Sequence, residues 1–451
     1  MGGTRVRPQA IDEYLHTMQQ RYERANRQGR TQLWRPDRLA AAGPSRQPGA
    51  AEDMKKTADV VIIGGGCMGT STAYHLARRG LTNVVLVERE ALLGTGSTGR
   101  NAGGVRHQFS SEANVRLSIE SIQAFERFRE EIGYEIDFHQ DGYLFLLSTA
   151  ESVDTFRRNV EMQRRLGVEV AWLSAREAAG LAPGLDVQGV VGATFCARDG
   201  IADPNGVTVG FANAARALGV EVVRETEALA VRVERGRVAA VETTRGEIST
   251  RTAVNAAGPY ARRVGEMAGV DIPVLPYRRH IFFAQPAAPG GWDRNDPSAP
   301  DTARVPSSRI MVIDFDTTFY FHREGANLLF GMSDPHEPPG FDTTVSWDFL
   351  AEVTEVATAR LPALADARVS HAWAGLYEVT PDAMPIIGPA KEVDGFFLIN
   401  GFSGHGFQHS PASGRILADL IVGRDPGFDP APFALDRFAR GGPLAPEVNV
   451  V

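Results

Sequence analysis

The most constraining feature of this 451-residue chain is a glycine-rich turn between two apolar runs. The first run, Val60–Ile63, leads into G-x-G-x-x-G and then into a stretch of helical character, Met68–Arg79. The three glycines are Gly64, Gly66 and Gly69. The second run, Val84–Val87, ends at Glu88, nineteen residues after the last glycine. This order of strand, turn, helix, strand and acid predicts a βαβ unit that binds a dinucleotide.

Each part of this motif has a physical role. Gly64 allows the tight turn from strand to helix, and Gly66 lets the backbone approach a pyrophosphate. Gly69 lets the helix pack close to its strand. Glu88 is placed to accept hydrogen bonds from a ribose.

Three further glycine-rich segments indicate which dinucleotide binds. Residues 93–106 hold five glycines between Gly94 and Gly104, so they offer many backbone N–H groups and little side-chain bulk. Taken alone, this stretch also fits a flexible surface loop. Residues 254–261 follow a β-rich stretch, and residues 401–407 precede a helical pattern. FAD is long enough to need contacts from several separated segments, and we therefore expect FAD.

These motifs together resemble a known family. They are the Gly64–Gly69 turn with Glu88, Gly-Ser-Thr-Gly-Arg-Asn-Ala-Gly-Gly-Val-Arg at 96–106, Asn-Ala-Ala-Gly-Pro at 255–259, Ala-Trp-Ala-Gly-Leu-Tyr at 372–377 and Gly-Phe-Ser-Gly-His-Gly at 401–406. From about Lys55 to the end, the chain resembles the D-amino-acid-oxidase (DAO) superfamily of FAD-dependent oxidoreductases. Its nearest likeness is to the group of sarcosine oxidase β subunit, dimethylglycine dehydrogenase and a mitochondrial FAD-dependent protein tied to respiratory complex I assembly.

The resemblance implies a set of FAD-binding residues. They are Gly64, Gly66, Met68, Gly69, Glu88, Arg89, Ser97, Thr98, Arg100, Asn101, Gly103, Gly104, Ala257, Gly258, Gly401, Gly404, His405, Gly406 and Phe407. Non-covalent binding is expected, because Arg100 stands where dimethylglycine dehydrogenase has a histidine. Gly375 likewise stands where monomeric sarcosine oxidase has a cysteine.

Composition excludes several other classes of protein. Two cysteines, Cys67 and Cys196, make no disulfide framework and favour a reducing, cytoplasmic location. No Cys-x-x-Cys or His-x-x-x-His pair suggests a metal site, so none is expected. No run of 18 or more apolar residues predicts a membrane span. The net charge of −8 argues against nucleic acid as a partner.

The expected fold is α/β, with a Rossmann-type FAD-binding domain interleaved with a mostly antiparallel β-sheet substrate domain. The FAD motifs fall in separated blocks, so the two domains alternate along the chain. The predicted blocks are 1–56 as an N-terminal extension, linker or fusion remnant, 57–133, 200–265 and 370–430 as FAD-binding parts, 134–199 and 266–369 as substrate-domain parts, and 431–451 as a C-terminal tail.

The first residues differ in character from the rest. Residues 11–27 fit a polar helix, and residues 34–51 are rich in Pro, Ala, Gly and Arg, as linkers are. Met54 followed by two lysines stands where a flavoprotein of this type would naturally start. Residues 1–53 are therefore expected to be a fusion remnant or an upstream start.

Arg106 is the first candidate for substrate binding. It occupies the position where sarcosine oxidases place a carboxylate-binding arginine, and a guanidinium grips a carboxylate through two hydrogen bonds. Pairing with a structural acid is the alternative. Amine oxidases of this group carry a lysine where this chain has Gln408. Oxidases also hold a lysine over the flavin, and Leu329 takes its place here, which favours a dehydrogenase.

Four further side chains are candidates near the flavin. His405 lies between two glycines before an expected helix over 411–422, whose N-terminus would stabilise negative charge on the reduced flavin. A turn histidine without a catalytic part is equally compatible. Tyr320 and His322 project to one face of an expected strand, and Tyr377 belongs to the 372–377 motif. Core aromatic residues are the alternative for these three.

The expected function is oxidation of a C–N bond in a small secondary or tertiary amine, such as an N-methyl or cyclic amino acid, by hydride transfer to flavin N5. The electron acceptor is open: oxygen, a redox protein or a quinone. Two alternatives remain. One is a 2-hydroxy-acid dehydrogenase, which Arg106 would serve equally well. The other is an FAD-bound assembly or electron-transfer factor for a respiratory complex.

Overall fold

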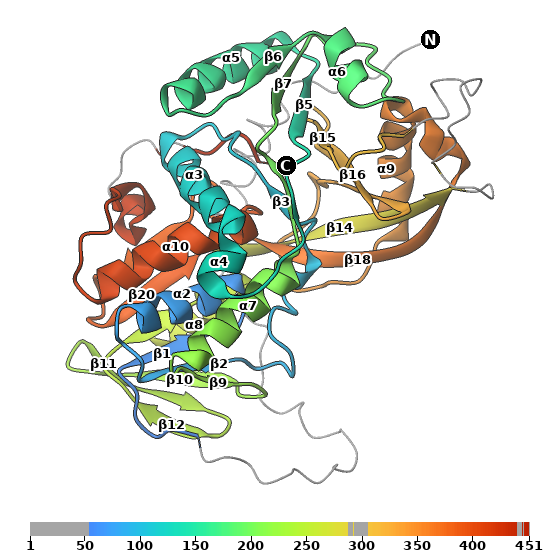
Figure 1. Ribbon diagram of the computed structural model, residues 1–451. Coiled ribbons are helices and arrows are strands. Elements are labelled where there is room, and N and C mark those ends of the chain that lie inside the picture. Colours follow the sequence, from blue (N-terminus) through green and yellow to red (C-terminus); the bar gives the residue numbers. More distant parts are fainter. Residues whose placement is uncertain (1–53, 287–291, 293–304, 440–443, 445, 451) are drawn as a thin grey trace, which may run out of the picture.

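A six-stranded sheet forms the lower half of the computed structural model in Figure 1. The structure describes residues 54–286, 292, 305–439, 444 and 446–450, so the expectations for residues 1–53 lie outside it. In spatial order the strands are β19 (Ile386–Pro389), β20 (Phe396–Asn400), β13 (Ala253–Asn255), β1 (Val60–Ile63), β2 (Val84–Val87) and β9 (Glu221–Val223). The pairs from β20 to β9 are parallel, and β19 is antiparallel to β20.

Both faces of this sheet are buried, which explains the unbroken apolar runs of β1 and β2. Val60 and Ile62 face one core, whereas Val61 and Ile63 face another. The first core lies under α2 (Cys67–Arg78), α3 (Glu112–Glu126), α7 (Pro204–Ala217) and α10 (Gly406–Ile421). The second lies under α8 (Ala261–Met267) and a three-stranded sheet, β10 (Ala228–Glu234), β11 (Arg237–Thr243) and β12 (Gly246–Ser249). Parallel strands covered on both sides carry such continuous runs.

An eight-stranded sheet forms the upper half of the molecule (Figure 1). Its strands in order are β18 (Ala367–Val379), β14 (Leu275–Pro286), β17 (Asn327–Met332), β16 (Phe319–Glu324), β15 (Met311–Asp314), β5 (Tyr143–Leu147), β7 (Gly192–Cys196) and β6 (Ala171–Leu173). All pairs are antiparallel except β5 with β15. The prediction of a Rossmann-type sheet with a mostly antiparallel second sheet is therefore confirmed.

The second sheet uses its two faces differently. One face packs on a core with α6 (Ala175–Leu181) and α9 (Trp347–Arg360) through Leu144, Phe282, Val312, Phe321 and Leu328. The alternating residues of the same strands, Tyr143, Ile281, Ile313, Tyr320 and Tyr377, belong to the opposite face, because paired residues of neighbouring strands share a face. This opposite face lines the cavities described below.

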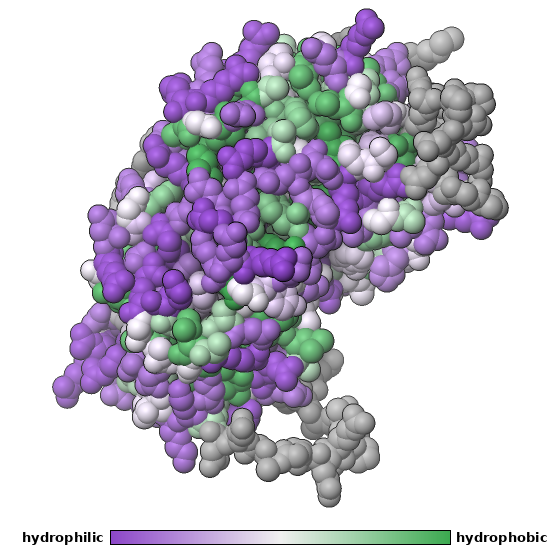
Figure 2. Space-filling view, in the orientation of Figure 1, coloured by the Kyte–Doolittle hydropathy of each residue, from purple (hydrophilic) through white to green (hydrophobic). Residues whose placement is uncertain are grey.

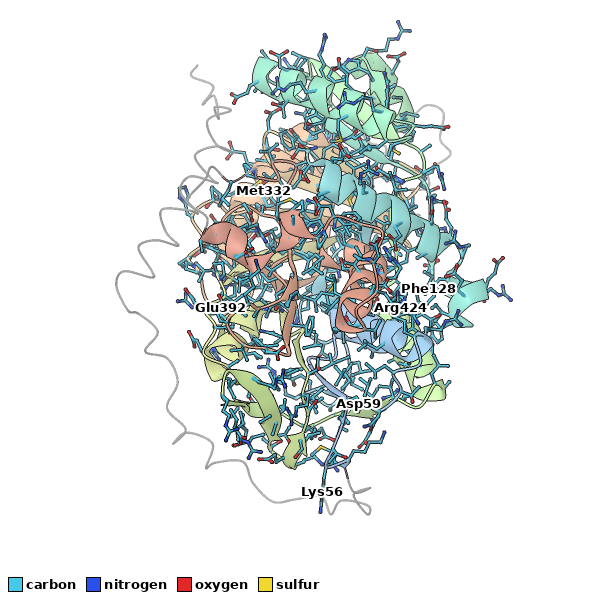
Figure 3. The ribbon with its side chains drawn as sticks, turned by 90° about the vertical axis from the view of Figure 1, so that its left-hand side faces the viewer. Lys56, Asp59, Phe128, Met332, Glu392 and Arg424 are labelled. Atoms are coloured by element: carbon cyan, nitrogen blue, oxygen red, sulfur yellow. The ribbon has the colours of Figure 1, made fainter. Side chains whose placement is uncertain are left out.

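Three short strands and two helices complete the elements named here. They are β3 (Gly104–Val105), β8 (Gly200–Ala202) and β4 (Phe138–His139), which form a small sheet, with α4 (Phe128–Ile132) and α5 (Ala150–Arg165). Figure 3 places Met332 of the eight-stranded sheet above and Asp59, just before β1, below. Helix α10 packs against α2, α3, β3, β19 and β20.

The predicted helix over 68–79 occurs as α2 with its bounds shifted by one residue, but the other predicted helix in the described residues differs. The expected helix over 411–422 begins five residues earlier, at Gly406, and contains Pro411 in its interior. Proline costs this helix one backbone hydrogen bond. Burial of the helix on both sides of Pro411 overrides that local preference, and Ser71 donates a hydrogen bond to the carbonyl of Ser410.

The strands of each sheet come from separated parts of the chain, as the interleaved arrangement requires. Strand β18 crosses the expected boundary between residues 369 and 370 and pairs with β14 along its whole length. The exact domain boundaries stay a prediction.

The surface offers few large apolar groups. Figure 2 shows hydrophilic residues over most of the visible face, with apolar residues in small scattered groups. Among the described residues, no helix is both long enough and apolar enough to cross a bilayer.

Candidate functional site: an FAD cleft and a small adjoining cavity

A cleft of about 490 Å³ lies between the two sheets. The turn after β1 forms one side of it, and residues of β14, β16 and β18 form another. Predicted FAD-binding residues that line it are Gly64, Gly66, Met68, Glu88, Arg89, Ser97, Thr98, Arg100, Asn101, Ala257, Gly258, Gly404, Gly406 and Phe407. Residues from all the separated sequence blocks thus meet in one cavity.

The other predicted FAD-binding residues do not line this cleft. Gly69 supports it from behind, because a Cβ there would lie 2.0 Å from the carbonyl oxygen of Gly64. Gly103 lies against the backbone of Ala202, and Gly401 against Thr380. Gly104 and His405 line the smaller cavity described below.

The acid at the end of β2 shapes the glycine turn. One carboxylate oxygen of Glu88 accepts a hydrogen bond from the backbone N–H of Gly65 at 2.7 Å, and the other accepts from that of Glu90 at 2.9 Å. The guanidinium carbon of Arg89 lies 3.9 Å from the centre of the Tyr260 ring. At the helix end of the turn, Thr98 accepts from the backbone N–H of Cys67 at 3.2 Å.

Glu378 is a buried carboxyl group in this cleft that the sequence analysis did not single out. One oxygen accepts a long hydrogen bond of 3.4 Å from the backbone of Phe402, while Oε2 has no hydrogen-bond partner among the described residues. Burial raises the pKa of Glu378 to about 7. An unpartnered oxygen in a cleft of this size is suited to a ligand hydroxyl.

A second cavity of about 70 Å³ adjoins the cleft. The two share Asn101, Ala102, Tyr320, Tyr377, Gly404 and Phe407 in their linings. The small cavity adds Gly104, Arg106, Tyr143, Met311, Ile313, Ser403, His405, Gln408 and Val450. The predicted catalytic residues Arg106, His405, Gln408 and Tyr320 are therefore all at this cavity. His322 is not, because its buried ring bonds to the backbone of Arg323.

Three tyrosines of the eight-stranded sheet form its walls, and each lies where a glycine leaves space. A Cβ at Gly104 would lie 1.7 Å from the hydroxyl of Tyr143, and one at Gly331 would lie 2.5 Å from that of Tyr320. A Cβ at Gly404 would lie 2.2 Å from the Tyr377 ring. Burial raises the pKa values of Tyr143 and Tyr320, so both hydroxyls are neutral.

Arg106 is buried beside the small cavity, with 5% of its surface exposed. Its guanidinium donates to the backbone carbonyls of Gln108 and Asn449 and lies 3.8 Å from the centre of the Phe109 ring. In the described part of the chain no carboxylate forms an ion pair with Arg106. Burial lowers the pKa of Arg106, and the nearby carboxylates of Glu447 and Asp199 partly oppose this without pairing with it directly. A guanidinium has five N–H donors, so these two bonds leave others for a ligand.

Gln408 and His405 support this site. The side-chain oxygen of Gln408 accepts from the backbone N–H of Arg106 at 2.7 Å, which fixes the strand end that carries the guanidinium. His405 contacts the Ala383 carbonyl through Nε2 at 3.1 Å and His409 through Nδ1 at 3.3 Å, and His409 Nε2 contacts Ser118. A carbonyl only accepts, so His405 carries its proton on Nε2, and Nδ1 accepts from His409.

These hydrogen bonds engage both ring nitrogens of His405, so neither is left to bind a substrate. Burial lowers the pKa of His405 to about 4, and burial also lowers the pKa of His409 well below its ordinary value. Both rings are therefore neutral at physiological pH. The geometry favours a supporting part for His405 over proton transfer.

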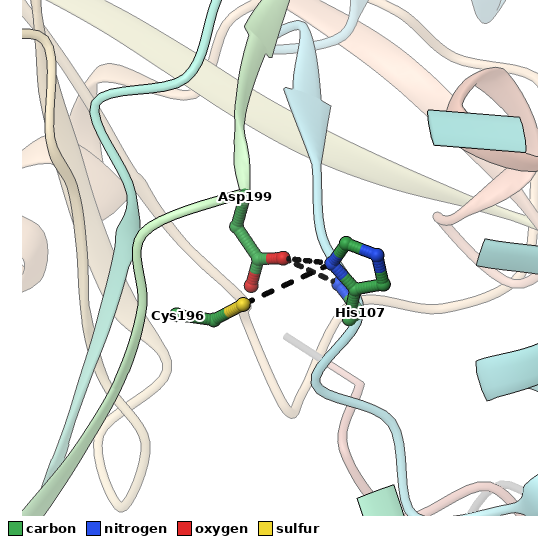
Figure 4. Close-up of side chains that lie close together, drawn as sticks. All are labelled: His107, Cys196 and Asp199. Atoms are coloured by element: carbon green, nitrogen blue, oxygen red, sulfur yellow. Dashed lines mark hydrogen bonds and ion pairs between the residues drawn. The ribbon is translucent and has the colours of Figure 1, made fainter. Parts of the chain in front are cut away.

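His107, Cys196 and Asp199 form the one group of three metal-ligand side chains found among the described residues (Figure 4). Nδ1 of His107 lies 2.6 Å from Asp199, whose carboxylate also accepts from the backbone of His107 and from the side chain of Gln108. Burial raises the pKa of the Cys196 thiol, so it stays protonated. This arrangement suits a hydrogen-bonded structural cluster, and the expectation of no metal stays a prediction.

Comparison with known proteins agrees with the cleft. The model of the DAO family, described as FAD-dependent oxidoreductase, matches residues 59–420. The chain belongs to this family. It is 32% identical over 409 residues to mitochondrial sarcosine dehydrogenase of Mus musculus, covering 88% of this chain and 43% of that protein. It is 31% identical to FAD-dependent oxidoreductase domain-containing protein 1 of Xenopus laevis, covering 87% and 85%.

Among solved structures, L-proline dehydrogenase from P. horikoshii has 34% sequence identity and a TM-score of 0.78, covering 86% of this chain and 99% of that one. The chain spans less than half the length of the sarcosine dehydrogenase and dimethylglycine dehydrogenase relatives. Family membership confirms the fold and the FAD cofactor.

The cleft residues of this DAO protein fit FAD. The glycine turn and Glu88 suit the adenosine and pyrophosphate end, and the unpartnered oxygen of Glu378 suits a hydroxyl. Arg100 and Gly375 both line the cleft and offer no thiol or imidazole for covalent attachment. Non-covalent binding therefore stays our prediction.

The sequence analysis missed Tyr143, Glu378 and the segment Pro446–Val450 as parts of the site. Tyr143 pairs with Met311, and Ile313, two residues further along that strand, pairs with Tyr320. Side chains alternate between the faces of a strand, so Tyr143 and Tyr320 share a face, and this alternation was the available signal for Tyr143. No local pattern marks Glu378 or the 446–450 segment. Both are placed by tertiary packing alone.

Proposed function

We propose that this DAO protein oxidises the C–N bond of a small secondary or tertiary amine that carries a carboxylate, such as an N-methyl or cyclic amino acid. One observation carries the proposal: Arg106, whose buried guanidinium forms no ion pair in the described chain, lines a small cavity that adjoins the FAD cleft. A buried cation bound only to carbonyl groups and an aromatic ring is poised to bind an anion. The names of the sarcosine and proline dehydrogenase relatives agree with such a substrate.

The cavity orients the donor and excludes water. FAD, held by the residues that line the cleft, would supply N5 as the hydride acceptor for the carbon beside the amine nitrogen, and the nitrogen lone pair would complete the C=N bond of the product. Arg106 holds the carboxylate, and the walls from Tyr143, Tyr320 and Tyr377 confine the substrate. The small volume of the cavity favours compact donors.

The residues lining the small cavity provide no general base. Among the described lining residues there is no carboxylate or lysine, and His405 is neutral with both ring nitrogens engaged. The amine must therefore bind as the neutral form. We expect the rate of flavin reduction to rise with pH according to the pKa of the substrate amine, as measured by stopped-flow absorbance with two donors of different basicity. A break near pH 6–7 that is the same for both donors would contradict this.

Anaerobic mixing of the FAD-loaded protein with matched compounds tests the proposal. Sarcosine, N,N-dimethylglycine and L-proline form one set, their analogues without the carboxylate form a second, and small 2-hydroxy acids form a third. Bleaching of the flavin by members of the first set alone supports the proposal. Bleaching by hydroxy acids alone would assign the other reaction, and bleaching by none would remove the enzymatic assignment.

A further inference from the structure

The segment Pro446–Val450 reaches the small cavity, where Val450 is part of the lining and Asn449 accepts a hydrogen bond from Arg106. Although it follows α10 by many residues, it returns to the site and makes hydrogen bonds along its length. Val450 lines the cavity together with Arg106, Tyr143 and Gln408. The segment therefore belongs to the site by contact.

Glu447 anchors this segment in the protein. Its side chain is fully buried and accepts hydrogen bonds from the backbone N–H groups of Ser110 and Ser111, at 2.7 and 3.1 Å, and from the amide of Asn114 at 2.9 Å. The hydroxyls of both serines also donate to it. Ser111 is the N-cap of α3, so the carboxylate lies at a helix end that favours negative charge.

From this anchor, Asn449 reaches Arg106. The backbone carbonyl of Asn449 accepts from the guanidinium, and its side-chain amide donates to the carbonyl of Gln108 at 3.3 Å. Asn159 on α5 donates to the side-chain oxygen of Asn449 at 3.3 Å. These bonds fix the carbonyl that holds one edge of the guanidinium.

We propose that the segment Pro446–Val450 is a specificity-determining wall of the substrate cavity, which orients Arg106 through the Asn449 carbonyl and limits donor size through Val450. This inference rests on the proposed role of Arg106 in binding the substrate carboxylate. Glu447 and Asn449 are positioning residues, because they act through Arg106. The wall holds the guanidinium ready for a compact carboxylate and leaves no room for a bulky one.

Titration of the FAD-loaded protein with small carboxylates tests the role of this wall without any oxidation of a substrate. Acetate and benzoate serve as compact and bulky probes, and the visible absorption of the flavin reports their dissociation constants. For Val450→Gly we expect benzoate to bind at least tenfold more tightly while acetate binding changes less than threefold. For Glu447→Gln, which weakens the anchor, we expect acetate to bind about tenfold more weakly.

Controls separate this inference from the function on which it rests. Glu392→Gln changes an exposed glutamate on the turn between β19 and β20 (Figure 3), and we expect the wild-type constants for both probes. If Val450→Gly keeps the wild-type ratio of benzoate to acetate affinity and Glu447→Gln keeps the wild-type acetate affinity, the wall is overturned and the role of Arg106 stands. If neither probe changes the flavin absorption of the wild-type protein, the proposal that Arg106 binds a carboxylate is wrong, and the proposed wall is wrong with it. Should Glu447→Gln not fold, Val450→Gly decides alone.

Discussion

The FAD cleft and the small cavity differ in which atoms form their walls. The cleft is shaped largely by backbone: a glycine turn, a glycine-rich loop and two later glycine-containing bends that bring main-chain groups to one place. The small cavity is shaped by side chains, three tyrosines on a β-sheet face, a buried arginine and a segment from far along the chain. A backbone-made site tolerates few changes of residue type, whereas a side-chain-made site is open to variation. This difference fits a family that shares one cofactor across several donors.

The largest expected effect is the loss of FAD binding when Gly64 is given a side chain. A second glycine with positive φ, which has open space around it, shows how much of the effect comes from backbone strain alone. Gly64 has φ of 115°, and a Cβ there would lie 2.4 Å from the carbonyl oxygen of Ala256. Gly80 also has a positive φ, 87°, but a Cβ there meets nothing within 4 Å. Gly64→Ala should purify without FAD and fail to take it up. Gly80→Ala should keep FAD and lose about 1–2 kcal/mol of stability. Absorbance of the purified proteins measures both, and equal FAD content would refute the space argument.

The second effect belongs to the small cavity. Arg106→Ala should keep wild-type FAD content and lose about 2–5 kcal/mol of transition-state stabilisation with carboxylate donors, read from kcat/KM. With the matching amine that lacks a carboxylate, the loss should be much smaller, because no anion is left unpaired. An equal loss with both donors would show that Arg106 acts on the fold instead of on the substrate.

The third effect uses pH to probe the cleft. The folded-state pKa of Glu378, about 7, lies above its ordinary value of 4.5, so the folded protein keeps this proton over a range where the unfolded chain has lost it. The free energy of unfolding therefore falls as pH rises from about 4.5 to 7, and the cost persists above that range. In FAD-free protein, Glu378→Gln should gain about 3 kcal/mol at pH 8 and almost nothing at pH 4. Denaturant unfolding at both pH values measures the gain, and a gain independent of pH would point to another cause.

The smallest effect concerns Glu88. Glutamine keeps one acceptor oxygen for the N–H of Gly65 but removes the negative charge that strengthens bonds from ligand hydroxyls. Glu88→Gln should therefore bind FAD about 10-fold more weakly. The FAD-free protein should lose about 1 kcal/mol of stability, because the N–H of Glu90 loses its acceptor. Quenching of FAD fluorescence on binding gives the affinity. Glu392→Gln, at an exposed glutamate that does not line the cleft, is the matched control.

The same contrast explains what the sequence could predict. The βαβ unit could be predicted because its glycines and Glu88 act at fixed spacing. The start of α10 was missed because Pro411 argues for a helix start, whereas packing of residues before it extends the helix. The tyrosine–glycine pairs, such as Tyr320 with Gly331, join residues whose relation depends on strand pairing. The 446–450 segment depends on tertiary packing alone.

A crystal structure of the FAD-loaded protein with a small unreactive carboxylate would test the central claim most directly. The account predicts FAD along the cleft from the Gly64 turn to the tyrosine-lined face, and the carboxylate in the small cavity within hydrogen-bonding distance of the Arg106 guanidinium. A carboxylate bound elsewhere, or FAD outside this cleft, would contradict it.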